Sequence, residues 1–226
     1  MSEEEAQAWL EAQGWWTGAA GDRLRLFVDL LLDEASRQNL ISEASKAAIW
    51  ARHIVDSAQL MLLAPGDDGL WIDLGTGAGL PGLVIACLRD APTELIEVRP
   101  LRATFLQRCV ETIGLGHVTV RGDKVERVKG GPARVISARA FAPLDRLLVS
   151  AGHLSDENTV WLLPKGRRGE MELANLSDDW QAMFHVEHSL TDPDSSIVTI
   201  RHLRRAAASR PASAGGAPRK GRRRPS

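Results

Sequence analysis

The most informative segment of this chain is Trp71-Ile72-Asp73-Leu74-Gly75-Thr76-Gly77-Ala78-Gly79-Leu80-Pro81-Gly82. The apolar run before the glycines predicts a strand, the glycines predict a sharp turn, and the apolar residues 83–88 predict a helix. Pro81 suits the first turn of that helix, because its φ is preset and its missing N–H would have no partner there. Free N–H groups at the helix start point toward any ligand that the turn approaches. The stretch therefore predicts a site for a nucleotide-like cofactor.

Two fingerprints fit the same glycines. Gly77, Gly79 and Gly82 satisfy G-x-G-x-x-G, the pattern of dinucleotide-binding turns. Asp73 followed by Gly75, Gly77 and Gly79 gives D-x-G-x-G-x-G, which resembles the first motif of S-adenosylmethionine-dependent methyltransferases. A turn that only packs a helix on a sheet is the third interpretation. It is disfavoured, because four glycines stand between an apolar strand and an apolar helix.

Composition sets the class of protein. The chain has 226 residues, 44% of them hydrophobic, which is enough for one sizeable core. No apolar run approaches the roughly 18 residues that a membrane span needs, and the acidic N-terminus is unlike a signal or transit peptide. Cys87 and Cys109 lie in apolar helical patterns, which favours core positions over a disulfide or a metal pair. We therefore expect a cytoplasmic protein with no metal site and no membrane partner.

Charge is unevenly distributed along the chain. Residues 201–226 contain nine Lys or Arg and no acidic residue, whereas the other 200 residues carry 19 basic and 29 acidic side chains. An acidic body with a basic tail indicates a polyanionic partner that is contacted through the tail.

The patterning divides the chain into three parts. Residues 1–69 are expected to be helical, residues 70–205 to form a cofactor-binding domain, and residues 206–226 to be a disordered basic tail. In the first part, the last helix is expected to run from Ser42 or Ser45 to about residue 63. Arg52 and Asp56 are four positions apart in that helix, which predicts a surface ion pair. The two preceding helices are expected over 3–13 and about 22–37.

Strand and helix patterns alternate from residue 70 onward, which predicts a mostly parallel sheet covered by helices. The last two strands have a short polar connection and predict an antiparallel hairpin. Five β/α units closed by a hairpin favour the class I, Rossmann-like methyltransferase sheet over the six parallel strands of a dehydrogenase. The expected strands are 70–74, 93–98, 117–121, 134–138, 158–163, 182–188 and 196–203, and the expected helices are 80–89, 101–114 and 143–152, with a weak turn at 124–129.

Acidic residues after the strands predict contacts with a nucleoside. Glu97 follows the second strand, 24 positions after Asp73, where a carboxylate typically accepts hydrogen bonds from both ribose hydroxyls. Asp123 or Glu126, after the third strand, is a candidate for the adenine end. Asp73 itself is expected to hold either the loop or the ammonium group of the cofactor.

Five motifs in order resemble the RsmG family, also called GidB, over roughly residues 20–203. The resemblance implies a class I methyltransferase that uses S-adenosyl-L-methionine to methylate N7 of a guanine in 16S ribosomal RNA, the position 527 guanine of the 530 loop. An additional Ala138 after Ser137 and the basic tail after Arg205 depart from the family pattern. The motifs are Asn39-Leu40, Arg52-His53-Ile54-Val55-Asp56-Ser57, residues 73–82, Ser137-Ala138-Arg139-Ala140-Phe141-Ala142, and Pro164-Lys165-Gly166.

The family's contacts with the cofactor, transferred motif by motif, fall on Gly75, Leu80, Val125-Glu126 and Arg139. Arg139 follows an apolar strand, at the edge where α/β ligand sites lie, and is the candidate for contact with the cofactor or the RNA. Together with the residues inferred from the turn and the second strand, the predicted cofactor site comprises Asp73, Gly75, Thr76, Gly77, Gly79, Leu80, Glu97, Val125, Glu126 and Arg139.

The expected substrate needs no general base, because guanine N7 carries an unprotonated lone pair at neutral pH. His53 is accordingly interpreted as a packing residue. Arg52, Lys165 and Arg201 are candidates for phosphate contacts, and Phe141 and Trp161 for stacking on the base, although both aromatic residues also fit a core. The expected partner is 16S rRNA, naked or in the small ribosomal subunit, bound by a monomer.

Three alternatives remain open at this point. An NAD(P)-dependent oxidoreductase would use the same glycines and Glu97. A noncatalytic ribosome-assembly or RNA-binding factor would bind RNA without transferring a methyl group. A methyltransferase could also act on a protein or a small molecule.

Overall fold

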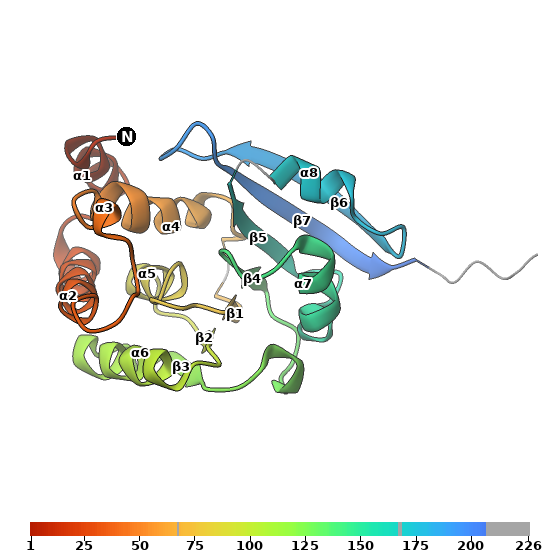
Figure 1. The fold of residues 1–226 in the computed structure, drawn as a ribbon, viewed down its shortest axis with the longest axis horizontal. Coiled ribbons are helices and arrows are strands. Elements are labelled where there is room, and N and C mark those ends of the chain that lie inside the picture. Colours follow the sequence, from red (N-terminus) through yellow and green to blue (C-terminus); the bar gives the residue numbers. More distant parts are fainter. Residues whose placement is uncertain (67, 167–168, 207–226) are drawn as a thin grey trace, which may run out of the picture.

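A single seven-stranded sheet organises the described residues, 1–66, 68–166 and 169–206, of the computed structural model (Figure 1). The strand order is β3-β2-β1-β4-β5-β7-β6. The first five strands are parallel, β7 is antiparallel to β5, and β6 is antiparallel to β7. The strands are β1 (Trp71–Leu74), β2 (Thr93–Ile96), β3 (Val118–Arg121), β4 (Val135–Ser137), β5 (Val160–Lys165), β6 (Trp180–His188) and β7 (Ser196–Arg205).

This mostly parallel sheet with its closing antiparallel hairpin confirms the predicted fold class. Each strand also begins and ends within two residues of its expected bounds. The chain crosses from β3 at one edge back to β4 beside β1. This crossover brings the loops after β1, β2 and β4 together at the carboxyl ends of the parallel strands, where ligands bind in open α/β sheets.

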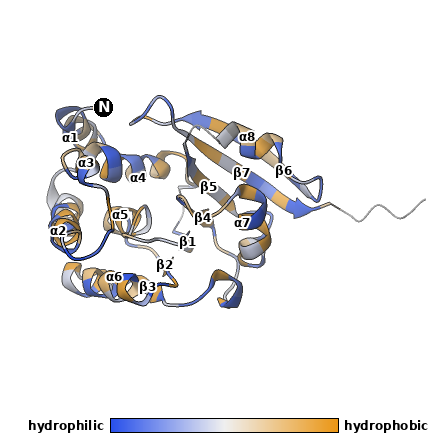
Figure 2. Cartoon of the chain, viewed as in Figure 1, coloured by the Kyte–Doolittle hydropathy of each residue, from blue (hydrophilic) through white to orange (hydrophobic). Residues whose placement is uncertain are grey.

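Helices cover both faces of the sheet (Figure 1). On one face lie α5 (Gly82–Leu88) and α6 (Pro100–Ile113), and on the other α7 (Leu144–Ala151) and α8 (Gly169–Ala174). Helix α5 is buried over nearly its whole length, whereas α6 has hydrophobic and hydrophilic residues along its course (Figure 2) and buries one side only. Cys87 and Cys109, one in each of these two helices, are buried and free, as predicted.

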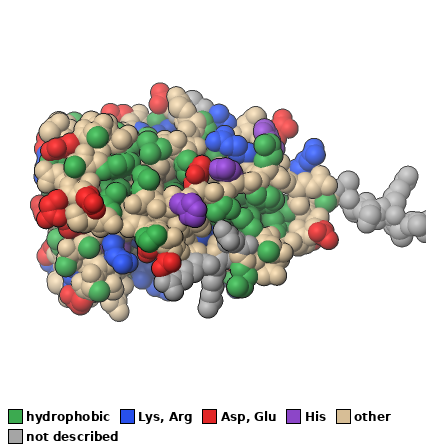
Figure 3. Space-filling view, turned by 90° about the horizontal axis from the view of Figure 1, so that it is seen from above, with side chains coloured by type: hydrophobic (Ala, Val, Ile, Leu, Met, Phe, Trp, Pro, Cys, Tyr) green, Lys and Arg blue, Asp and Glu red, His purple; other side chains and the backbone are tan. Residues whose placement is uncertain are grey.

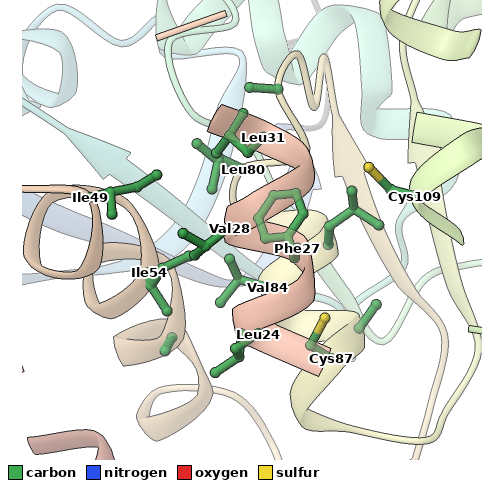
Figure 4. Close-up of a cluster of buried hydrophobic side chains, with 14 of the residues drawn as sticks. Leu24, Phe27, Val28, Leu31, Ile49, Ile54, Leu80, Val84, Cys87 and Cys109 are labelled. Carbon is green, nitrogen blue, oxygen red and sulfur yellow. The ribbon is translucent and has the colours of Figure 1, made fainter. Parts of the chain in front are cut away.

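The N-terminal helices share a core with the sheet's helices. Leu24, Phe27 and Leu31 form a stripe along α2 (Gly18–Glu34) that packs against Leu80 and Val84 (Figure 4). Full burial of such side chains contributes about 1.5–3 kcal/mol each. The helices before β1 are therefore attached to the cofactor-binding part through a continuous hydrophobic cluster, to which α1 (Glu3–Ala12) contributes Ala6 and Leu10.

The long helix expected up to residue 63 is wrong. The chain instead forms α3 (Glu43–Lys46), a π-helix η1 (Trp50–Val55), α4 (Asp56–Ala58) and a 3₁₀-helix η2 (Gln59–Leu62). The carboxylate of Glu3, in α1, accepts the N–H groups of Trp50 at 3.2 Å and Ala51 at 2.8 Å. These bonds replace partners that a regular α-helix would supply, and π-turns of this kind are frequent at functional sites.

Two further expectations concern the C-terminal third. Helix α8 was not expected, because six residues are too few to show a helical periodicity. The predicted disordered tail, 206–226, lies outside the described residues except for Ala206. Among the helices that the structure describes, all are too short or too polar to cross a bilayer.

The turn after β1 is closely packed. Gly75 has φ +64°, a conformation that favours glycine, and the ring of Phe141 packs directly against it. At Gly82 a β-carbon would lie 2.7 Å from Asp73 Oδ2 and would also overlap Leu95. The glycines of this stretch therefore serve two purposes, one conformational and one steric.

We expect Gly82→Ala to lower the free energy of unfolding by about 1–3 kcal/mol, because the added methyl group displaces the Asp73 carboxylate and Leu95. Gly116→Ala is the matched control, since a β-carbon there meets nothing within 4 Å. Urea denaturation of the two variants measures the difference. Equal stability of the variants would contradict this packing.

Candidate functional site

A buried carboxylate ties the glycine turn to two strands. Asp73, at 0% exposure, accepts the Gly82 N–H at 2.9 Å through Oδ2 and the Ser137 hydroxyl at 2.6 Å through Oδ1. Ser137 in turn accepts the indole N–H of Trp71 at 2.9 Å. Of the two roles considered for Asp73, the structure supports holding the loop. Ser137, to which the sequence assigned no role, completes this arrangement from β4.

Burial raises the pKa of Asp73 to about 6, while the hydrogen bonds from Ser137 and Gly82 act in the opposite direction. The group thus retains its proton to a higher pH in the folded chain than in the unfolded chain. Its ionisation near neutral pH has a cost in stability, which is about 1.4 kcal/mol for each unit of pKa difference.

A second carboxylate holds the turn from β2. Glu97 is 4% exposed; its Oε2 accepts the Gly77 N–H at 3.0 Å and its Oε1 accepts the Arg99 N–H at 2.8 Å. A carboxylate offers about four acceptor positions. The two backbone bonds therefore orient Glu97 and leave acceptor capacity for the two ribose hydroxyls of a nucleoside.

The Glu97 pocket is a cavity of about 400 Å³ beside this carboxylate. It brings together four of the predicted cofactor residues, Gly75, Glu97, Val125 and Glu126, from the ends of β1, β2 and β3. Apolar walls suit an adenine ring, and the oriented carboxylate suits a ribose, so the residues present fit an adenosyl cofactor. Its full lining is Gly75, Ile96, Glu97, Val98, Arg99, Arg102, Asp123, Lys124, Val125, Glu126, Ala140 and Phe141.

Other predicted cofactor residues act behind this surface. Gly77 orients Glu97 through its N–H, and Thr76 N–H donates to the Ile96 carbonyl at 3.1 Å. Leu80 is 3% exposed, with its side chain in the core shared with α2 (Figure 4). Asp73, Thr76, Gly77, Gly79 and Leu80 are absent from the lining of the Glu97 pocket.

The Lys165 pocket is a second, larger cavity of about 610 Å³ on the other side of Ala140 and Phe141, which line both. Its walls come from the loops after β4 and β5, from α8 and from the β6–β7 connection. Two ion pairs and several apolar side chains face it. The lining is Asp56, Arg139, Ala140, Phe141, Ala142, Pro143, Pro164, Lys165, Gly166, Gly169, Glu172, Ser189, Ser195, Ser196 and Ile197.

Arg139 forms an ion pair with Asp56 at 3.3 Å and lies on the Lys165 side of the site. Asp56 Oδ1 also accepts the Thr191 hydroxyl at 2.8 Å and the Gln59 amide at 3.1 Å. The expected Arg52–Asp56 surface pair is wrong, because Asp56 points inward to these partners. Asp56 thus links the N-terminal helices, the loop after β4 and the β6–β7 connection.

His53 is not a candidate base. Both of its ring nitrogens are buried and lack a hydrogen-bond partner among the described residues. Burial and the nearby Arg139 lower its pKa to about 4.

Of the two aromatic candidates for stacking on the RNA base, Trp161 is excluded because it is fully buried in the core, whereas Phe141 lines both pockets.

The predicted phosphate contacts lie at three places. Lys165 lines the pocket named after it, and Arg52 is exposed at a neighbouring polar cavity that Asp56 and Arg139 also line. Arg201 lies farther along β7, where it donates to the Leu63 carbonyl at 3.2 Å. Acidic side chains gather over the N-terminal helices at the left of Figure 3, so a polyanion would favour other parts of the surface.

Residues 21–202 match the family model described as rRNA small subunit methyltransferase G, GidB. The chain is 47% identical over 229 residues to the ribosomal RNA small subunit methyltransferase G of Novosphingobium aromaticivorans, covering 99% of this chain and 98% of the relative. It is 50% identical over 194 residues to the protein of the same name from Sphingopyxis alaskensis, covering 83% of each. The first alignment extends beyond residue 202, into the tail.

Solved structures share the fold. A SAM-dependent methyltransferase from Aquifex aeolicus superposes with a TM-score of 0.53 at 14% identity, covering 64% of this chain and 88% of that one. At this identity the likeness supports the class I methyltransferase architecture alone.

We expect the stability of the wild-type chain relative to Asp73→Asn to fall by about 2 kcal/mol between pH 4 and pH 7. The folded pKa of Asp73 lies above its unfolded value, so its contribution to stability is largest at low pH and is lost as the pH rises through about 6. The asparagine variant lacks this titration. Chemical denaturation across the pH range measures the difference.

The exposed Asp178→Asn is the control, and its difference from the wild type should stay constant over the same range. A pH-independent difference for Asp73→Asn would contradict the assigned burial of that charge.

Proposed function

The chain belongs to the GidB family of rRNA small subunit methyltransferases, and from that premise we propose that it methylates N7 of a guanine in 16S ribosomal RNA. It is an S-adenosyl-L-methionine-dependent rRNA methyltransferase. Membership of this family removes the oxidoreductase alternative. The acceptor atom, the RNA position and the partner are the parts that we propose.

One observation supports the proposal most directly: the Glu97 pocket and the Lys165 pocket adjoin each other across Ala140 and Phe141. One cavity fits an adenosyl group. The other is walled by the loops after β4 and β5, and its apolar surfaces and ion pairs suit a planar, polar-edged ring. A methyl transfer requires such adjacent sites for donor and acceptor.

Bound S-adenosylmethionine supplies a methyl group on a positively charged sulfur, which a lone pair can attack. Guanine N7 presents such a lone pair on the major-groove edge. The chain's residues therefore have to hold the base about 3–3.5 Å from the methyl carbon, in line, and to exclude water. Positioning of this kind is worth an effective molarity on the order of 10⁵–10⁸ M. This reaction therefore requires no general base.

The roles of individual residues follow from their positions. We propose that Glu97 binds the ribose, that Val125 and Glu126 border the adenine, and that Gly75 lets the cofactor approach the backbone. Arg139, held by Asp56, faces the acceptor side. Arg52 lies on the same side, exposed and suited to an RNA phosphate.

The finer assignment is the guanine at position 527, in the 530 loop, with the small ribosomal subunit as the partner and a cytoplasmic monomer as the acting species. The motifs from Asn39 to Gly166 that resemble the family support it. An RNA base presented in a loop can be splayed out into a cavity such as the Lys165 pocket.

Transfer of labelled methyl from S-adenosylmethionine to small subunits that lack the modification, followed by mapping of the base, tests the proposal. We expect incorporation at one guanine, with label released by chemistry specific for N7-methylguanine. The variant Glu97→Ala should lose most of the transfer, since it loses both the ribose acceptors and the anchor of Gly77. Binding of RNA without transfer by the wild-type chain would favour the noncatalytic alternative, and labelling of protein would favour another acceptor.

Arg139→Ala should retain the fold but lose at least about tenfold in kcat/KM for methyl transfer, the effect of removing one charge-assisted contact. Thermal unfolding checks the fold, which should persist because Asp56 keeps its hydrogen bonds from Thr191 and Gln59 when Arg139 is removed. Arg146→Ala, on the exposed side of α7, is the control with expected normal transfer. Normal turnover by Arg139→Ala would remove Arg139 from the site.

A further inference from the structure

The Lys165 pocket contains an adjacent donor and acceptor that the proposed reaction has not used. Lys165 Nζ, at the end of β5, lies 2.7 Å from Glu172 Oε2 in α8. The two side chains are 12% and 28% exposed, so both are largely shielded and face the same cavity. A charged pair in such a position either holds α8 on the sheet or binds a ligand.

Both side chains are held in place. Glu172 Oε2 also accepts the Leu144 N–H at 3.0 Å, which fixes the carboxylate against the start of α7. Lys165 has three N–H donors, of which one is used by Glu172 and one is within 3.5 Å of the Ala142 carbonyl. Within the described part of the chain, no donor is bonded to Glu172 Oε1. The pair therefore retains both an acceptor and a donor for a ligand.

The other ion pair of the pocket is less available. Asp56 uses Oδ1 for Thr191 and Gln59 and Oδ2 for Arg139, so its acceptor capacity is largely taken. This difference singles out Lys165 and Glu172 as the polar pair that can select a ring.

The hydrogen-bonding edge of guanine is complementary to the donor of Lys165 and the acceptor of Glu172. Its O6 accepts hydrogen bonds, whereas the neighbouring N1–H and 2-amino group donate them. Adenine has the reverse order at the corresponding positions, a donating amino group beside an accepting N1, and would place a donor against the lysine. Recognition through this edge leaves guanine N7 on the other edge, free to react.

We propose that Glu172 and Lys165 select guanine in the Lys165 pocket, a step that rests on the proposed function. Glu172 accepts hydrogen bonds from N1–H and the 2-amino group through Oε1, and Lys165 donates to O6 while keeping its bond to Glu172 Oε2. Phe141, which lines both pockets, provides the apolar surface against the base. The pair thus confers specificity for the acceptor base, and no bond is made or broken by it.

Small subunits with either guanosine or inosine at the mapped position test this assignment, because inosine lacks only the 2-amino group. The wild-type chain should lose on the order of 10- to 100-fold in kcat/KM on inosine, the effect of one hydrogen bond to a charged acceptor. Glu172→Ala and Glu172→Gln should be slower on guanosine but should show at most about a twofold further loss on inosine. Lys165→Met should be slower on both substrates. It should keep the inosine penalty, which is the loss in kcat/KM on inosine relative to guanosine, since Lys165 contacts O6 and not the 2-amino group.

Two controls separate the outcomes. Glu111→Ala, exposed on α6, should keep both the wild-type rate and the wild-type penalty. Calorimetry with S-adenosylhomocysteine and thermal unfolding show whether each variant is folded and binds the cofactor product. An inosine penalty that is absent in the wild-type chain, or unchanged in the Glu172 variants, overturns the assignment. A wild-type chain that methylates no guanine overturns the proposed function instead.

Discussion

The buried carboxylate of Asp73 is the constraint on which the rest of the structure depends. It connects the end of β1 to the start of α5 through Gly82 and to β4 through Ser137. Because the group is fully buried, a missing donor would leave an uncompensated charge in the core, which is costly. The turn between β1 and α5 is therefore held in one shape, and Glu97 fixes its outer side through Gly77.

The position of the two pockets follows from this turn. Phe141 packs on Gly75, so the loop after β4 is located by the turn after β1, and this loop is the partition between the cavities. Asp56 then ties the same loop to the N-terminal helices and to the β6–β7 connection through Arg139 and Thr191. Donor and acceptor sites are in this way positioned by a few buried polar contacts, and a reaction that needs only positioning is well served by them.

The N-terminal helices show why local patterns are insufficient for function. Their apolar stripes could be predicted from the sequence, and α2 packs on α5 through the residues with helical spacing. The interruption of the following helix by η1 could not be predicted from local sequence, because it depends on Glu3, nearly fifty positions earlier in the chain. Asp56, which pairs with Arg139 83 positions later, follows this interruption directly.

The sequence by itself determined the seven strands, their mostly parallel order with a closing hairpin, the glycine turn and the acidic residue after β2, since periodicity, glycine and strand-end chemistry are local signals. Only the tertiary structure decided which of those residues face a ligand. Asp73 and Leu80 are behind the site, Phe141 divides it, and α8 brings Glu172 to Lys165. The reason is physical: contacts between distant segments depend on how the layers pack, and packing is a property of the whole chain.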